Sequence, residues 1–248
     1  MMVSILRGVV SFSLLFCLAA AQSNVHYAID FVTSVSTSQF KCIHDTGYDL
    51  VFIRVYDVDG FDSNAITNIR NAFTLNLNVE VFMIPQPKSA KSGAKQFSEV
   101  YQSLELNGLN IQSLWIKVFN PSKWPSSAAA NRNFIDDIYT QAQKNQVSVG
   151  IYTSISDWQH ITSDYTGPAD RQQNLWYYQN SGPGKSGESQ PDFKDFEPFG
   201  GWKSAGVKQF AQVEGVCDVL TNRNIYYAAS SVASIGKETN ETMIGGNL

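Results

Sequence analysis

The chain has 248 residues, of which 43% are hydrophobic and 16% charged, and its formal net charge is -4 at pH 7. This length suits one large barrel or two small domains. The mildly acidic balance and the lack of a basic stripe argue against nucleic acid as a partner.

The N-terminal residues predict a secretory signal peptide over residues 1–21. Arg7 precedes a short apolar run that ends in Ala19-Ala20-Ala21, and cleavage is expected before Gln22. The run is shorter than the roughly 20 apolar residues that a spanning helix needs, and no later stretch approaches that length. We therefore expect residues 22–248 to be secreted, extracellular or lumenal, without membrane association.

The cysteines and one sequon predict covalent modifications of a secreted chain. Removal of the signal peptide takes away Cys17 and leaves Cys42 and Cys217 in an oxidising compartment, where free thiols are uncommon. We expect these two to form a disulfide, worth roughly 5 kcal/mol for so long a loop in the chain-entropy model. Two unpaired buried thiols are the alternative. Asn240, in Asn240-Glu241-Thr242, is the candidate N-glycosylation site in a polar C-terminal tail.

Apolar runs alternate with segments of helical length along the chain. The runs lie at residues 27–32, 50–56, 79–84, 114–119, 147–152, 175–178 and 207–210, and the helical segments at residues 36–44, 64–75, 94–106, 128–145 and 154–161. Strands that alternate with helices pair in parallel through right-handed crossovers. The regularity fades after Tyr152, and the turn formers of residues 179–193 predict a long loop. The pattern predicts an α/β fold, a single irregular (β/α) TIM-like barrel of parallel strands.

Candidate site residues follow from the rule that the C-terminal strand ends and their loops build the site of such a barrel. This rule selects Asp30, Asp57, Asp59, Gln86, Lys117, Phe119, Tyr152, Trp176 and Tyr178. Aromatic faces beside hydrogen-bonding groups suit a sugar, whose C–H faces stack on rings. We predict that Tyr152, Trp176, Tyr178 and Asp57 bind substrate. The alternative is that the aromatics only fill the barrel, which we favour for Trp115.

Five segments, in order along the chain, resemble a known family. They are residues 27–30 (Tyr-Ala-Ile-Asp), 47–56 (Gly-Tyr-Asp-Leu-Val-Phe-Ile-Arg-Val-Tyr), 149–153 (Val-Gly-Ile-Tyr-Thr), 175–177 (Leu-Trp-Tyr) and 207–210 (Val-Lys-Gln-Phe), the last leading to Cys217. Together they resemble the glycoside hydrolase family 25 lysozymes, and the invertebrate lysozyme-like branch most closely. The resemblance implies an irregular barrel related to the eight-stranded kind, and action on the sugar backbone of bacterial peptidoglycan.

The resemblance also assigns the family's acids, and this chain keeps one of them. Asp30 matches the acid of the first strand, whereas Lys117 and Phe119 replace the Asp-x-Glu pair at the end of the fourth strand. A further family acid near the last strand falls on Asn222. Glycoside hydrolysis ordinarily needs one carboxylic acid that protonates the leaving oxygen and a second group that stabilises or attacks the sugar.

The residues at positions 117 and 119 predict weak or absent hydrolysis. Phe119 has no proton to donate. An ammonium at Lys117 near Asp30 would hold that carboxylate ionised and would oppose positive charge on the sugar. Losing a general acid alone costs about 100- to 10,000-fold in rate.

A proton donor could instead come from a loop acid. The candidates are Asp57, Asp59, Glu188, Asp192, Asp195 and Glu197. Acids in polar loops are usually only solvated, and Asp57 with Asp59 also look like turn formers. Asp30 could serve only to orient Arg54 or backbone amides.

Metal and cofactor chemistry have little support in the sequence. The three histidines, His26, His44 and His160, show no metal-ligand spacing. No phosphate-binding glycine loop appears. We therefore expect neither a metal nor a cofactor.

The sequence leaves two functions open for a monomeric secreted protein. The first is a weak or altered muramidase that uses Asp30 with a relocated acid and acts on bacterial cell walls in innate defence or digestion. The second is a non-catalytic protein that binds peptidoglycan or a related glycan through its aromatic side chains. The replacement of acids by Lys117 and Phe119 favours the second function on chemical grounds.

Overall fold

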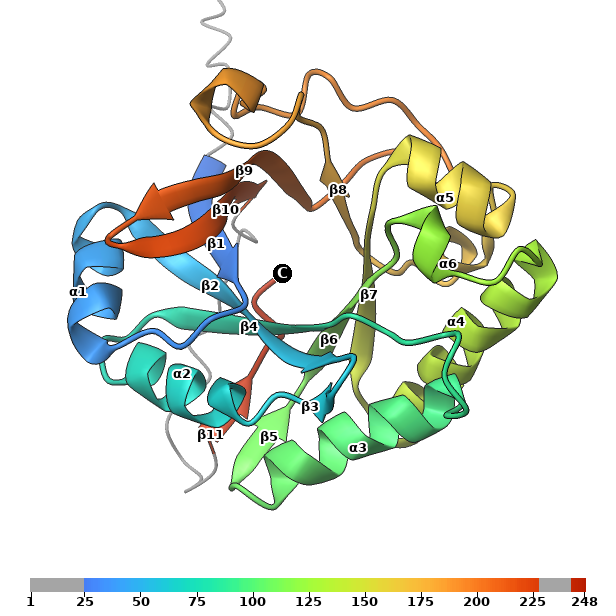
Figure 1. Ribbon diagram of the computed structural model, residues 1–248, viewed down its shortest axis with the longest axis horizontal. Coiled ribbons are helices and arrows are strands. Elements are labelled where there is room, and N and C mark those ends of the chain that lie inside the picture. The colour runs from blue at the N-terminus through green and yellow to red at the C-terminus, as the bar shows by residue number, and fades with distance from the viewer. Residues whose placement is uncertain (1–24, 228–241) are drawn as a thin grey trace, which may run out of the picture.

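Eight strands form a closed barrel that is surrounded by helices (Figure 1). The computed structural model describes residues 25–227 and 242–248. In order around the ring, the strands are β1 (Val25–Phe31), β2 (Tyr48–Asp57), β4 (Asn78–Met83), β6 (Ser113–Lys117), β7 (Ser148–Thr153), β8 (Leu175–Tyr178), β9 (Val207–Val216) and β10 (Val219–Tyr227). The ring closes because β1 pairs with both β2 and β10. The predicted α/β class and irregular TIM-like barrel are confirmed.

The last strand corrects one part of the sequence prediction. The first seven barrel strands run parallel, but β10 is antiparallel to both of its neighbours, β9 and β1. The expectation of parallel strands throughout is therefore wrong. Cys217 and Asp218 form a two-residue turn in which both have positive φ, 54° and 60°, and such a turn joins adjacent antiparallel strands directly. It leaves no room for a helical crossover.

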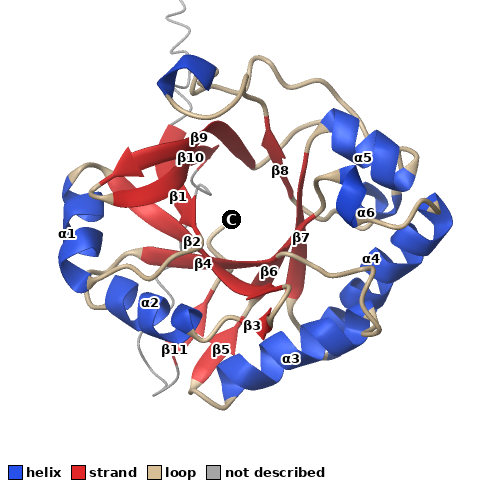
Figure 2. Ribbon diagram, in the orientation of Figure 1, coloured by secondary structure: helices blue, strands red, loops and turns tan. Residues whose placement is uncertain are grey.

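The helices lie outside the barrel (Figure 2), and serines cap the start of four of them. Their bounds are α1 (Thr37–Asp45), α2 (Asn64–Phe73), α3 (Gly93–Glu105), α4 (Ala128–Lys144), α5 (Ile155–Thr162) and α6 (Gly167–Asp170). Ser36, Ser92, Ser127 and Ser154 each accept a hydrogen bond from a backbone N–H in the first turn of α1, α3, α4 and α5. These bonds satisfy donors that have no partner inside the helix. The five predicted helices are all present within a few residues of their expected ends.

Aromatic side chains fill the middle of the barrel. Phe52, Phe82, Trp115 and Trp176 are buried there, one from each of four strands. Phe52 stacks on Trp176 with ring centroids 4.1 Å apart, and Trp115 meets the same ring edge-on at 5.8 Å. Gly150 makes room for this packing, because a Cβ atom there would lie 2.4 Å from the Trp115 ring. Trp115 is thus a core residue, as the sequence suggested.

A long loop joins β8 to β9, as the turn formers of residues 179–193 predicted. Residues 179–206 hold only the short 3-10 helix η2 (Lys185–Gly187). The loop is fixed by Lys208 of β9, whose fully buried Nζ atom donates to the backbone oxygens of Gln190 (2.7 Å) and Asp192 (2.8 Å) and to the Asp195 carboxylate (2.7 Å). One lysine therefore attaches the loop to the outside of the barrel.

Three short strands lie outside the ring or extend it. The hairpin partner β3 (Gly60–Phe61) pairs with the end of β2, and β5 (Leu109–Ile111) pairs in parallel with β11 (Thr242–Ile244). After β11 the chain passes beneath the barrel, where the backbone N–H of Gly245 donates to Val79 and that of Asn247 donates to the Glu80 carboxylate, both at 2.9 Å. Leu248 packs against the interior cluster, and Figure 1 places the C-terminus near the centre of the ring.

Three sequence predictions concern residues outside the described ranges. They are the signal peptide over residues 1–21, which contains Cys17, its cleavage before Gln22, and N-glycosylation at Asn240. These stay predictions. Within residues 25–227 and 242–248, no helix is long and apolar enough to cross a membrane.

The predicted disulfide is present. The Sγ atoms of Cys42 in α1 and Cys217 in the β9–β10 turn are 2.04 Å apart, across a sequence separation of 175 residues. The bond attaches the antiparallel hairpin to the first helix.

Removing this disulfide should lower the free energy of unfolding by up to about 5 kcal/mol, because the unfolded chain regains the freedom of a long closed loop. The measurement is urea unfolding of the Cys42→Ser, Cys217→Ser double variant against the natural chain. Lys41→Ser, on the exposed side of α1, serves as the control and should change stability by less than about 0.5 kcal/mol. Equal effects of the two changes would contradict the prediction.

Candidate functional site

A buried ion pair lies at the C-terminal end of the barrel interior. Lys117, the last residue of β6, donates from Nζ to Oδ2 of Asp30 on β1 at 2.6 Å, and the two side chains are only 6% and 1% exposed. Asn222 donates to the same oxygen and Asn224 to Oδ1, each at 2.9 Å. The structure thus brings together Asp30, Lys117 and Asn222, three of the four positions that the resemblance singled out.

Aromatic rings enclose the Lys117 ammonium. Its Nζ atom lies 4.0 Å from the ring centroid of Phe82, 4.4 Å from that of Tyr152 and 4.6 Å from that of Trp176. Burial lowers the pKa of Lys117, and the Asp30 carboxylate opposes that shift. The ion pair and the ring faces both favour the charged ammonium.

The second replaced acid position carries a hydrophobic ring. Phe119 follows the end of β6, is half-buried, and meets Tyr152 edge-on with ring centroids 6.1 Å apart. Both oxygens of Asp30 are occupied by nitrogen donors, from Lys117, Asn222 and Asn224. Among the described contacts of Asp30, none is with a second carboxyl group.

Asp57 is held by an arginine at the rim. Its carboxylate lies 2.8 Å from Arg54 and also accepts a hydrogen bond from the backbone N–H of Asp59 at 3.1 Å, within the β2–β3 turn. Arg54 is also paired with Asp62 at 2.9 Å. The structure therefore agrees with the turn-former interpretation of Asp57. The alternative that Asp30 orients Arg54 is wrong.

The acids of the long loop bind cations on the outer side of the barrel. Glu188 pairs with Arg223 of β10 at 2.9 Å, and Asp195 pairs with Lys208 of β9 at 2.7 Å. Neighbours on a strand alternate between faces, and because Asn222 and Asn224 point inward, Arg223 points outward. Asp192 lies 3.3 Å from Lys194. Asp59 and Glu197 are exposed.

Asp157 is an acid at the site that the sequence analysis missed. It lies in the first turn of α5, just after β7, and its carboxylate accepts hydrogen bonds from the Tyr178 hydroxyl and, at 3.0 Å, from the backbone N–H of Asn120. Tyr178 in turn stacks on Tyr152, with ring centroids 5.2 Å apart. The only sequence signal was Ser154 three residues earlier, which marks a helix start and so suggested a purely structural role.

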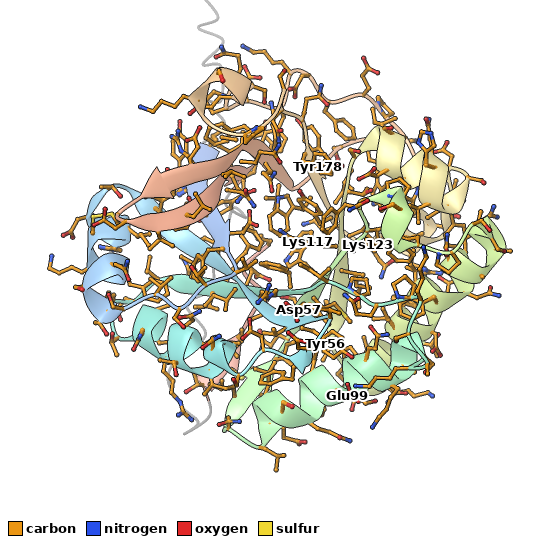
Figure 3. All side chains as sticks on the ribbon, viewed as in Figure 1. Tyr56, Asp57, Glu99, Lys117, Lys123 and Tyr178 are labelled. Carbon is orange, nitrogen blue, oxygen red and sulfur yellow. A yellow bond between two sulfur atoms is a disulfide. The ribbon has the colours of Figure 1, made fainter. Side chains whose placement is uncertain are left out.

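The tyrosines join the two acids through one continuous set of contacts. Burial raises the pKa of Tyr152, and Asp30 and Asp157 both add to the rise. Burial and the bond to Asp157 likewise raise the pKa of Tyr178. The Tyr152 hydroxyl donates to Gln209 at 3.1 Å. Figure 3 shows Lys117 near the centre of the ring, with Tyr178 and Asp57 on opposite sides of it.

The predicted substrate-binding residues differ in their access to solvent. Tyr178 is half-buried at the rim, whereas Tyr152 is nearly buried and Trp176 is completely buried. The Trp176 indole donates to Oδ1 of Asn224 at 2.9 Å, and Asn224 binds Asp30. Trp176 therefore positions the ion pair indirectly, through Asn224. Its contact with a substrate stays a prediction. No group of three or more His, Cys, Asp or Glu in the described ranges could hold a metal ion.

Comparison with solved structures defines the class of this barrel. The family GH25 lysozyme from Aspergillus fumigatus matches it with a TM-score of 0.64 over 84% of this chain and 96% of that chain, at 13% identity. The muramidase from Trichobolus zukalii matches with a TM-score of 0.63 over 83% of this chain and 95% of that chain, at 16% identity. The fold is that of the GH25 lysozymes.

Sequence comparison assigns the chain to one family within this fold. Residues 21–210 match the family model described as Lysozyme-like protein 1. Lysozyme-like protein 2 of Caenorhabditis elegans is 41% identical over 216 residues, which cover 86% of this chain and 77% of that protein. The chain belongs to this lysozyme-like family, as the five sequence segments indicated.

Breaking the central ion pair on one side only should destabilise the fold. Lys117→Met leaves the buried Asp30 carboxylate without its counter-charge, which costs about 3–5 kcal/mol. In the double variant Asp30→Asn, Lys117→Met no buried charge remains, so the loss should be much smaller than the sum of the two single losses. Urea unfolding of the four proteins measures this coupling.

An exposed pair of the same length is the control for this cycle. Lys41 and Asp45 are also 2.6 Å apart, but their side chains are 66% and 55% exposed. Breaking that pair should cost less than about 1 kcal/mol. Additive losses for Asp30 and Lys117 would show that the two charges do not depend on each other.

Proposed function

We propose that this protein is secreted and binds the glycan strands of bacterial peptidoglycan at the C-terminal end of the barrel, without cleaving them by the two-carboxylate mechanism. The observation that carries the proposal is the 2.6 Å ion pair between Lys117 and Asp30. It occupies the position where glycoside hydrolysis would need a proton donor.

The electrostatics of this pair disfavour hydrolysis. An oxocarbenium-like transition state places positive charge on the sugar, so a hydrolase offers it a carboxylate that is free to respond. Here Lys117 already neutralises Asp30, and its own positive charge would repel the developing charge. Phe119 cannot supply the proton, a loss of about 100- to 10,000-fold by itself.

Sugar binding needs neither of the missing acids. The half-buried rings of Phe119 and Tyr178 lie at the rim, near the exposed Asn120, and such rings and amides suit the C–H faces and hydroxyls of a sugar. The structural match to a protein named as a muramidase supports a cell-wall glycan as the ligand. The Cys42–Cys217 disulfide supports a secretory route.

Hydrolysis with a relocated acid is the second candidate, and Asp157 is the observation that favours it. This carboxylate lies at the same end of the barrel as Asp30 and is bound to Tyr178. Tyr152 and Tyr178 stand between the two acids. In this case the chain would clear a wall suspension. Asp30→Asn would abolish clearing at a cost in stability, and Asp157→Asn would abolish it while leaving the fold intact.

Purified protein should sediment with insoluble peptidoglycan and release no reducing sugar. Tyr178→Ala should weaken sedimentation by roughly 10-fold, the loss expected for an aromatic binding residue. Tyr27→Ala removes an exposed tyrosine on the outer side of β1, where it contacts Tyr48 and Phe210, and should bind as the natural chain does. Failure of the natural chain to sediment would count decisively against binding.

Restoring the family's acids tests whether only the acids are missing. The double variant Lys117→Asp, Phe119→Glu returns a proton donor to the end of β6, so it should release reducing sugar from peptidoglycan where the natural chain releases none. Circular dichroism and thermal unfolding check that it folds. Lys117→Asn, Phe119→Gln, which changes the same positions without adding acids, is the matched control and should stay inactive. Lysis by the natural chain at a rate equal to that of the double variant would refute the electrostatic argument.

A further inference from the structure

Two carboxyl groups on the outer side of the barrel share one arginine nitrogen. Nη1 of Arg223 on β10 lies 2.9 Å from Oε1 of Glu188 and 3.2 Å from Oε2 of Glu214. Glu188 follows η2 in the β8–β9 loop, and Glu214 belongs to β9. When both carboxyl groups are ionised, the cluster therefore holds two negative charges against one positive charge. It lies outside the barrel, so the proposed function does not use it.

Glu214 is the buried member of the pair. Its side chain is 7% exposed, whereas that of Glu188 is 29% exposed. The Oε1 atom of Glu214 is buried and has no hydrogen-bond partner in the described part of the chain. Ionised carboxylates only accept hydrogen bonds, but a carboxyl group that takes up a proton also donates one. A single proton would therefore let the buried group bond to its neighbour, and would remove one uncompensated charge from the interior.

Other titratable groups around the pair do not supply the missing positive charge. The Tyr48 hydroxyl of β2 accepts a hydrogen bond from Nε of Arg223 at 2.8 Å, and burial raises the pKa of this tyrosine, so it stays neutral. Tyr27 of β1 meets the Tyr48 ring edge-on. Lys208, which also points outward from β9, is bound to Asp195. Within the described ranges, Arg223 is the one cation paired with either glutamate.

The surroundings make Glu214 the member that holds the proton. Burial raises the pKa of Glu214, and the nearby Glu188 carboxyl, within hydrogen-bond reach, raises it further against the opposing effect of Arg223. A carboxyl group whose pKa is higher in the folded chain than in the unfolded chain favours the fold in acid. That contribution is lost as the pH rises through the pKa of the folded state.

The pair lies where the β8–β9 loop returns to the barrel. Ser189, next to Glu188, donates from its backbone N–H to the Phe210 carbonyl at 2.9 Å and from its hydroxyl to the Gln179 carbonyl at 2.5 Å. Gln179 directly follows β8, and Phe210 belongs to β9. A hydrogen bond within the glutamate pair would therefore fasten the loop to β9 beside the end of β8.

We propose that the two glutamates form a proton-operated latch on the β8–β9 loop. In acid, Glu214 is protonated and donates to Glu188, which stays bound to Arg223, and the loop is held against β9. At neutral pH both carboxyl groups are ionised and repel each other, so the loop opens more often. This inference does not rest on glycan binding, because the latch uses neither the Asp30–Lys117 pair nor the rings at the rim.

Hydrogen exchange of the Ser189 backbone N–H measures how often the latch opens. In the natural chain its protection factor, corrected for the intrinsic exchange rate, should rise from neutral pH to about pH 5. A rise of roughly 10-fold corresponds to a pKa of Glu214 that is one pH unit lower in the open loop. Glu214→Gln replaces the proton by a permanent N–H donor, so protection should be high at both pH values. Glu188→Ala removes the acceptor, so protection should be low at both.

Thermal unfolding adds a control of opposite sign. Burial tends to raise the pKa of Glu99, but Lys91 at 2.8 Å and the Tyr56 hydroxyl at 3.1 Å lower it overall. Glu99→Gln should therefore lower the melting temperature more at neutral pH than in acid. Glu214→Gln should instead raise the melting temperature at neutral pH, by about 2 °C or more, and leave it unchanged in acid.

Three results would overturn the proposal. They are Ser189 protection that does not change with pH in the natural chain, a pH dependence that persists in Glu214→Gln, and a melting temperature of Glu214→Gln that falls at neutral pH as that of Glu99→Gln does. Failure of the natural chain to sediment with peptidoglycan would count against the proposed function and would leave these three measurements unaffected.

Discussion

The buried contact between Asp30 and Lys117 organises one whole end of the barrel. It joins β1 to β6, and a charge in that position is tolerated only when it is fully compensated. Asn222 and Asn224 from β10 complete the shell of the carboxylate, and Trp176 holds Asn224 in place. Lys117 is thus part of a polar network, and the rings of Phe82, Tyr152 and Trp176 surround its ammonium group.

Under the proposed function, this network separates glycan recognition from glycan cleavage. Stacking and hydrogen bonding to a sugar depend on rings and amides at the strand ends, which this barrel retains in Tyr178, Phe119 and Asn120. Bond cleavage depends on a carboxyl group that can give up a proton. Asp30 is the carboxyl group that matches a family acid, and both of its oxygens already accept hydrogen bonds from the network. Under the proposed function, a fold shared with hydrolases would bind the glycan without carrying out the reaction.

The sequence predicted what depends on local pattern and missed what depends on pairing. Alternating apolar runs and helical segments gave the barrel, and the compartment argument gave the Cys42–Cys217 bond. The antiparallel β10 was missed because Cys217-Asp218 lacks the glycine that usually marks a two-residue hairpin turn. Asp157 was missed because its spacing from Ser154 signals a helix start. No sequence pattern reveals which buried amides lack a partner among the described residues, because that property belongs to the folded surroundings.

The position of the disulfide has a consequence for how the molecule comes apart. The ring is closed where its first strand, β1, meets its last, β10, and this seam is the one contact between barrel strands that lie far apart in sequence. The Cys42–Cys217 bond joins α1, which follows β1, to the turn that precedes β10. The disulfide is therefore a covalent link beside the β1–β10 seam, where we expect the barrel to open first. Slow opening of this kind protects a protein from proteases outside the cell, whatever its equilibrium stability.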